Sequence, residues 1–200
     1  MSDITTRSDI TTGSDITTGR SRWKAVLRRW PIALAVGVSA AGLAAGSSAG
    51  EITSLAEVLL LLPLLYLMAA RIRRPEASWP LLLALVVLYV VLRALDVVAV
   101  PAVFTALALA VMVWGAVAGD LRRSGAFRAQ ALGMIGFGAL ALVALVAEPD
   151  LGRYLVAAGW FLHGFWDFVH FRRNAVVSRS YAEWCGVFDI LLAAQLVFLA

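Results

Sequence analysis

Five residues near the C-terminal end of the chain recur at a spacing that could support chemistry. Trp160, His163, Asp167, His170 and Asn174 follow one another at intervals of three, four, three and four residues. On an α-helix such intervals place side chains on one face. An imidazole and a carboxylate one turn apart can form a hydrogen-bonded pair that fixes the imidazole tautomer. Two imidazoles and a carboxylate can also supply three zinc ligands, and the same groups can serve as a structural polar network between helices.

A second polar face follows later in the chain. Tyr181, Cys185 and Asp189 are spaced by four residues and therefore share one helical face. No basic residue lies in the apolar stretch 181–199 that carries Asp189, and burial away from water disfavours a charged carboxylate. The sequence predicts that Asp189 is either a functional acid or a protonated group bonded to a neighbouring helix. We interpret Cys185 as a packing residue, because no neighbour in the sequence would activate its thiol.

Three more ionisable residues lie in apolar stretches nearer the N-terminus. Glu57 stands just before the run LLLLPLLYL and is the strongest single candidate for a functional acid. Arg93 and Asp96 are three residues apart, which predicts an ion pair, and Glu57 is the alternative partner for Arg93. A charge at the centre of a membrane-spanning helix costs about 2.5–3.5 kcal/mol, so each of these residues is a candidate site residue.

The elements that carry these residues are strongly apolar. The chain of 200 residues is 62% hydrophobic, whereas soluble domains are nearer one half. This composition predicts an all-α, polytopic bundle in a lipid bilayer. The arginines lie in the breaks between apolar runs, so membrane topology explains the net charge of +4 and no nucleic-acid partner is expected. The single cysteine excludes an internal disulfide.

We divide the chain into a tail and one membrane domain. Residues 1–21 contain the hexapeptide SDITTR/G three times and are expected to be disordered, because they are too polar to form a core. Residues 22–200 are expected to form a seven-helix transmembrane domain. The basic segment and apolar run at its start also fit a cleaved secretory signal, as an alternative to a retained first helix. The predicted spans are 30–47, 52–70, 79–98, 101–119, 127–147, 151–172 and 181–199.

Basic residues alternate between successive loops. Five lie in the segment 20–29 just before the first span, none lies in the loop that follows this span, and every second loop thereafter is rich in arginine. The loops on the opposite side contain only Arg153. Because arginine and lysine favour the cytoplasmic side, the pattern places the N-terminus in the cytoplasm and the C-terminus outside.

The chemistry suggested by these acids needs no cofactor. The chain has no P-loop, dinucleotide-binding glycine fingerprint, HExxH or GxSxG motif. A desolvated carboxylic acid can protonate an alkene or epoxide, and a water-poor aromatic cavity can then guide the carbocation. Aromatic residues crowd the last two predicted spans and could form the walls of such a cavity.

With Glu57 in the second predicted span and Asp189 in the seventh, the chain resembles the small integral-membrane terpene cyclases of fungal meroterpenoid pathways and their bacterial relatives that make indole sesquiterpenes. The resemblance implies a prenylated aromatic or indole substrate, with no metal and no nucleotide. It implies that Glu57 is the proton donor and Asp189 its partner, with Asp167 as the alternative second acid. The residues expected to contact the substrate are Trp160, His163, Asp167, Trp184, Arg93 and Asp96.

Two other functions remain open on the sequence. A zinc-dependent membrane hydrolase could use His163, Asp167 and His170, with Glu183 as a further ligand, and would resemble the seven-helix ceramidase and receptor-like group. A small transporter or proton path could use the polar groups as a ladder through the bilayer. Its layers would be Glu57, Arg93 and Asp96, then Asp189, then His163, Asp167 and Glu183.

Overall fold

The computed structural model describes residues 29–45 and 49–198, and the regular structure in these residues is entirely helical. The predicted all-α fold is confirmed. The predicted tail lies outside the described residues. The long helices in the described part are α2 (Trp30–Ala45), α3 (Ala49–Ile72), α4 (Ser78–Leu95), α5 (Val100–Val117), α7 (Gly125–Val146), α8 (Pro149–Arg173) and α9 (Arg179–Phe198). Two short elements, η1 (Pro75–Ala77) and α6 (Asp120–Arg123), lie in connections between them.

Five of these helices are long and apolar enough to cross a membrane. They are α3, α4 with the preceding turn, α5, α7 and α9. The apolar part of α2 covers Trp30–Ala41 and is shorter, and α8 carries more polar residues. Length and hydropathy therefore identify a multi-pass membrane protein.

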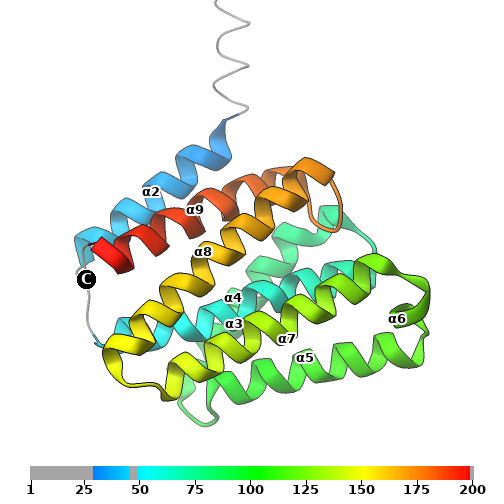
Figure 1. The fold of residues 1–200 in the computed structure, drawn as a ribbon, viewed down its shortest axis with the longest axis horizontal. Coiled ribbons are helices and arrows are strands. Elements are labelled where there is room, and N and C mark those ends of the chain that lie inside the picture. Colours follow the sequence, from blue (N-terminus) through cyan, green and yellow to red (C-terminus); the bar gives the residue numbers. More distant parts are fainter. Residues whose placement is uncertain (1–28, 46–48, 199–200) are drawn as a thin grey trace, which may run out of the picture.

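Helix α3 runs through the middle of the bundle, where it packs against α4, α5, α7 and α8. In the most apolar segment of α3, 67% of the residues are buried within the protein, whereas in the corresponding segment of α4 only 11% are buried. An unbroken leucine run suits a helix that has protein on every side, whereas α4 leaves most of its apolar surface for lipid. Helices α8 and α9 pack along each other, and α2 covers α9 from the outside (Figure 1).

Contacts between helix ends show that successive long helices alternate in direction. The backbone N–H of Ser178, just before α9, donates to Ser78 Oγ at the start of α4 over 3.0 Å. His170 near the end of α8 contacts Gln130 near the start of α7. Arg73, just after α3, contacts Asp120 at the start of α6 over 2.7 Å. One end of the bundle therefore holds the starts of α4, α7 and α9 and the ends of α3 and α8.

This arrangement gathers the arginines at one end of the bundle. The helix ends and connections that meet there carry Arg71, Arg73, Arg74, Arg122, Arg123, Arg128, Arg172, Arg173 and Arg179. At the opposite end lie Arg93 and Arg153, together with several acidic residues. We call the first of these the arginine-rich end.

One helix boundary differs from the prediction and affects a candidate site residue. The third predicted span ran to residue 98, but α4 ends at Leu95. Asp96 follows it in a left-handed conformation, with φ 49° and ψ 30°, and is exposed. The helical spacing that predicted an Arg93–Asp96 pair therefore does not extend to Asp96.

Candidate functional site

The polar face predicted on α8 points into the bundle. Trp160, His163, Asp167 and His170 are all buried, and His163 and Asp167 are completely so. Asn174, the fifth member of the predicted face, ends the helix in a left-handed conformation and is exposed. The expectation of an inward face is confirmed for four of its five residues.

The polar face predicted on α9 meets that of α8. Tyr181, Cys185 and Asp189 are each completely buried. Glycines allow the two helices to approach closely at this level. A Cβ atom on Gly164 of α8 would lie 3.1 Å from the Asp189 Cβ, and one on Gly186 of α9 would lie 3.2 Å from the Asp167 Cβ. Each carboxylate therefore lies against a glycine of the opposite helix, as small residues permit in membrane bundles.

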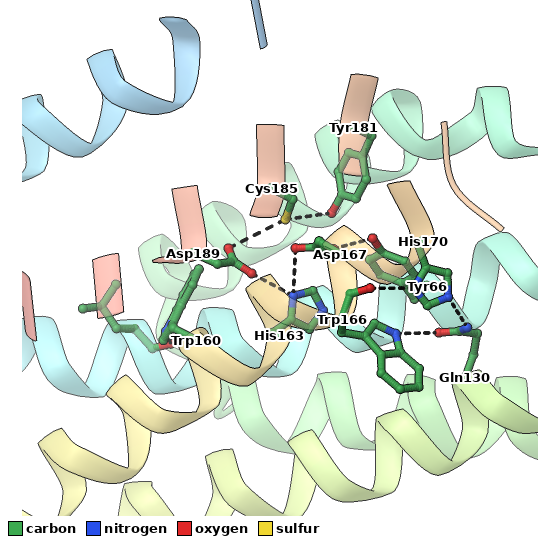
Figure 2. Close-up of polar contacts among 11 residues, drawn as sticks. Tyr66, Gln130, Trp160, His163, Trp166, Asp167, His170, Tyr181, Cys185 and Asp189 are labelled. Atoms are coloured by element: carbon green, nitrogen blue, oxygen red, sulfur yellow. Dashed lines mark hydrogen bonds and ion pairs between the residues drawn. The ribbon is translucent and has the colours of Figure 1, made fainter. Parts of the chain in front are cut away.

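His163, Asp167, Cys185 and Asp189 form a compact group that we call the acid cluster (Figure 2). His163 Nδ1 lies 2.8 Å from Asp189 Oδ2 and 3.4 Å from Asp167 Oδ2. The Cys185 thiol lies 3.8 Å from Asp189 Oδ1. One potential ligand atom from each of the four residues lies within 4.8 Å of the others. Two carboxylates thus share one imidazole nitrogen, and the partner nearer to His163 is Asp189 on the next helix.

Tyr66 connects the acid cluster to the central helix. Its hydroxyl donates a hydrogen bond to Asp167 Oδ1, across 101 residues of sequence. Its ring packs edge-on against both histidines of α8, with centroid distances of 5.5 Å to His163 and 4.9 Å to His170. Tyr66 is itself buried, so α3, α8 and α9 all contribute polar groups to one interior site.

The charges of the acid cluster do not balance by themselves. A protonated His163 beside two ionised carboxylates leaves one negative charge, and His163 is the only ion-pair partner of Asp167 and Asp189 among the described residues. Asp167 Oδ2 and His163 Nε2 are buried without hydrogen-bond partners in that part of the chain. Because an uncompensated charge in an apolar interior is costly, the cluster must take up an additional proton or a cation.

His170 belongs to a separate polar group. Its Nε2 lies 2.9 Å from the Gln130 amide nitrogen, and its Nδ1 lies 2.8 Å from the Trp166 carbonyl oxygen. The Trp166 indole N–H donates to Gln130 Oε1 over 3.2 Å (Figure 2). Glu183 is half-buried and lines a different cavity. The predicted zinc set containing His170 and Glu183 is therefore not assembled, and Cys185 and Asp189 lie beside His163 and Asp167 in their place.

Glu57 and Arg93 form an ion pair between α3 and α4. Arg93 Nη1 lies 3.6 Å from Glu57 Oε1, and Arg93 Nη2 donates to Ser54 Oγ over 3.3 Å. The predicted Arg93–Asp96 pair is thus wrong, and the alternative pairing with Glu57 is correct. Glu57 is 5% exposed, and its Oε2 has no hydrogen-bond partner within the described chain. Glu57 and Asp189 therefore belong to two different polar contacts, and no contact in the described structure joins them.

Aromatic side chains extend the site along α8 and α9. The Trp160 indole N–H donates to the Leu55 carbonyl oxygen over 3.2 Å, and its ring lies 5.8 Å from the Phe188 ring. Phe188 stacks on Trp184, with centroids 5.6 Å apart and planes within 7°. The Trp184 indole nitrogen is buried without a partner among the described residues. An aromatic wall therefore lies beside the polar site, on the side of α9 that carries Phe188 and Trp184.

Two residues of the site were not predicted from the sequence. Tyr66 stands alone in a leucine run, and Gln130 stands alone near the start of α7. An isolated polar side chain in an apolar helix is a weak sign of an interior contact, because lipid would not satisfy it. The isolated positions of Tyr66 and Gln130 could therefore have marked them as interior residues, but they do not show which residues Tyr66 and Gln130 contact.

Comparison of this chain with protein-family models, with curated proteins and with solved structures found no match.

Proposed function

We propose that this protein is an enzyme of the cell membrane that acts on a lipid-soluble substrate through the acid cluster. In this proposal all seven long helices span the bilayer, including the short α2 and the more polar α8. The N-terminus is cytoplasmic and the C-terminus is outside. The gathering of arginines at one end supports this orientation, because arginine is retained on the cytoplasmic side.

The observation that carries the proposal is the sharing of His163 Nδ1 by two buried carboxylates. If a proton neutralises the remaining charge, one aspartate is a carboxylic acid in a site that excludes water. Such a group can act as a general acid on a substrate that enters from the bilayer. His163 binds the aspartate that stays ionised, and it can transfer a proton back to the aspartate that acted as the acid.

The reaction that we favour is cyclisation of a prenylated aromatic or indole compound. Protonation of an alkene carbon, or of an epoxide oxygen with opening of its C–O bond, creates a carbocation, which is attacked by another double bond of the same substrate. Loss of a proton to the carboxylate then regenerates the acid, so the product is an isomer of the substrate. Trp160, Trp184 and Phe188 form an aromatic group next to the acid cluster, and rings of this kind can stabilise a cation. The two acids of this proposal are Asp189 and Asp167, since Glu57 lies in a separate pair with Arg93.

Membranes that contain the protein provide the test. Farnesylated indoles and other prenylated aromatics, with and without a terminal epoxide, are supplied, and products of unchanged mass and altered retention are measured. We expect Asp189→Asn and Asp167→Asn to lower the rate by at least about 100-fold, the size typical of a lost general acid. Asp96→Asn is the matched control, because Asp96 is exposed and off the helix.

Glu57→Gln separates the two assignments of the proton donor. Activity that survives Glu57→Gln and is lost in Asp189→Asn assigns the chemistry to the acid cluster. Activity lost in Glu57→Gln alone assigns the donor to Glu57, as the family resemblance implies. Absence of an isomeric product from every substrate contradicts the cyclase proposal.

A divalent metal ion, in place of a proton, could also balance the negative charge that remains on the acid cluster. A dication, two carboxylates and a neutral imidazole sum to zero, so His163, Asp167 and Asp189 would supply three ligands to a neutral site; Cys185 lies within 4.8 Å of them, but as a thiolate it would add one negative charge. Such a site would support metal-assisted hydrolysis of a lipid. Elemental analysis of the purified protein tests it: one metal ion per chain, lost in Asp189→Asn, would favour the hydrolase, and a metal-free sample with full cyclase activity would exclude it.

A further inference from the structure

A cavity lies at the arginine-rich end of the bundle, separate from the acid cluster. Its volume is about 790 Å³, and it lies between the start of α2, the end of α8 and the start of α9. Its lining residues are Arg29, Trp30, Pro31, Phe171, Arg179, Ser180 and Glu183. None of these residues belongs to the acid cluster, so this cavity needs its own explanation.

One charged group of the cavity contacts an aromatic ring of the lining, and none forms an ion pair with a described residue. Arg179 is held over the ring of Phe171, with its guanidinium carbon 4.3 Å from the centroid. Neither Arg29, Arg179 nor Glu183 forms an ion pair with another described residue. The lining therefore offers two guanidinium groups and one carboxylate to a ligand. A guanidinium group binds phosphate oxygens with good geometry, and its planar donors favour a bidentate contact.

With all seven long helices across the bilayer, as proposed above, the cavity lies at the level of the lipid headgroups. The Trp30 and Trp79 rings lie 5.3 Å apart, and the Trp79 indole N–H donates to Ser180 Oγ over 3.1 Å. Tryptophans are enriched at the depth where acyl chains meet headgroups. Basic pockets between helices on the cytoplasmic side are a known form of lipid-headgroup site.

We propose that this cavity binds the phosphoethanolamine headgroup of a membrane lipid. Arg29 and Arg179 bind the phosphate, and Glu183 accepts hydrogen bonds from the primary ammonium group. Glu183 is the feature that favours this headgroup, because its carboxylate can accept hydrogen bonds from a primary ammonium group, which phosphatidylglycerol lacks. The inference rests on the proposed arrangement of the helices in the membrane, but it is independent of the proposed reaction, since it involves no residue of the acid cluster.

Lipid retention by the purified full-length chain tests the proposal. The delipidated protein is mixed with equal amounts of phosphatidylethanolamine, phosphatidylglycerol and phosphatidylcholine, and the bound lipids are counted by native mass spectrometry. We expect phosphatidylethanolamine to be retained preferentially, and Arg179→Gln to lower its retention at least tenfold. Arg173→Gln is the matched control, because Arg173 is exposed at the same end and does not line the cavity.

Two further experiments, one with a variant and one with a soluble competitor, identify the ligand. Glu183→Gln should shift retention from phosphatidylethanolamine towards phosphatidylglycerol, since it removes the ammonium partner. Free phosphoethanolamine at millimolar concentration should fail to displace the lipid, whereas displacement would show that the site takes a soluble compound and overturn the lipid assignment. Equal retention of all three lipids, or equal losses in Arg179→Gln and Arg173→Gln, would overturn the proposal. Thermal unfolding of each variant distinguishes a lost ligand from a lost fold.

Discussion

Individual side chains in the bundle interior satisfy one another across helices. Asp167 contacts His163 on its own helix and accepts from Tyr66 on α3, while Asp189 reaches His163 from α9. A buried polar group in an apolar interior is expensive unless it has such partners. The acid cluster therefore couples the stability of three helices to the groups proposed to perform chemistry.

Tyr66→Phe tests this coupling, because it removes one hydroxyl and leaves the ring. Asp167 Oδ1 would lose its donor, and its other oxygen already lacks a hydrogen bond in the described structure. We expect a loss of about 1–3 kcal/mol in the free energy of unfolding, measured in detergent, because a buried acceptor is left unsatisfied.

Tyr154→Phe is the control for that experiment. Tyr154 is half exposed, and its hydroxyl bonds only to the neighbouring Arg153 in the described chain. Its removal should change stability by less than about 0.5 kcal/mol. Equal effects of the two substitutions would contradict the structural role assigned to Tyr66.

The sequence correctly predicted which side chains of α8 point into the bundle, but it did not predict which residues on other helices they contact. The spacing of His163, Asp167 and His170 correctly identified an inward face, because helical periodicity is a local property. The same spacing could not show that His170 turns to Gln130 while His163 turns to Asp189. Those contacts depend on the relative rotation and depth of separate helices.

At the scale of elements, glycines determine how closely the helices pack. In α5, a Cβ atom added to Gly115 would lie 2.1–2.9 Å from three ring atoms of Phe127 on α7. Phe127 is fully buried. In α7 itself, Gly136 is exposed, and an added Cβ would meet nothing within 4 Å.

The pair Gly115→Ala and Gly136→Ala tests the packing of α5 against α7. We expect Gly115→Ala to destabilise the protein by about 1–3 kcal/mol, because overpacking forces the ring and backbone apart. Gly136→Ala should be neutral or stabilising, since alanine favours a helix by up to about 1 kcal/mol. Thermal unfolding in detergent measures both, and a Gly115→Ala protein as stable as the parent would contradict the close contact.

Helix α8 shows why apolar content alone does not identify every element of such a bundle. It is 25 residues long, yet its polar residues exclude it from the helices that qualify by hydropathy. His163, Asp167 and His170 are buried inside the bundle, whereas Asp150, Arg172 and Arg173 are exposed at the two ends of the helix. A helix whose polar groups are satisfied inside the protein can still be proposed as a span, because the bilayer contacts only its outer face.

For the whole molecule, the gathered arginines favour one orientation in the membrane. A fluorescent or enzymatic reporter fused after Ala200 tests it directly. We expect alkaline phosphatase at this position to be active, because that enzyme folds only outside the cytoplasm, and a reporter of cytoplasmic location to be silent. The opposite result would show that an even number of helices spans the bilayer, or that the orientation is reversed.

The sequence by itself determined the helical fold, the apolar character of the membrane domain and the inward faces of α8 and α9. These properties follow from composition and local periodicity, which each helix carries alone. Only the tertiary structure decided that Arg93 pairs with Glu57, that Asp189 joins His163, and that Tyr66 reaches Asp167. The physical reason is that lipid and leucine are equally apolar. The hydrophobic effect therefore does not select helix partners in a bilayer, and close packing at glycines and matched polar groups selects them.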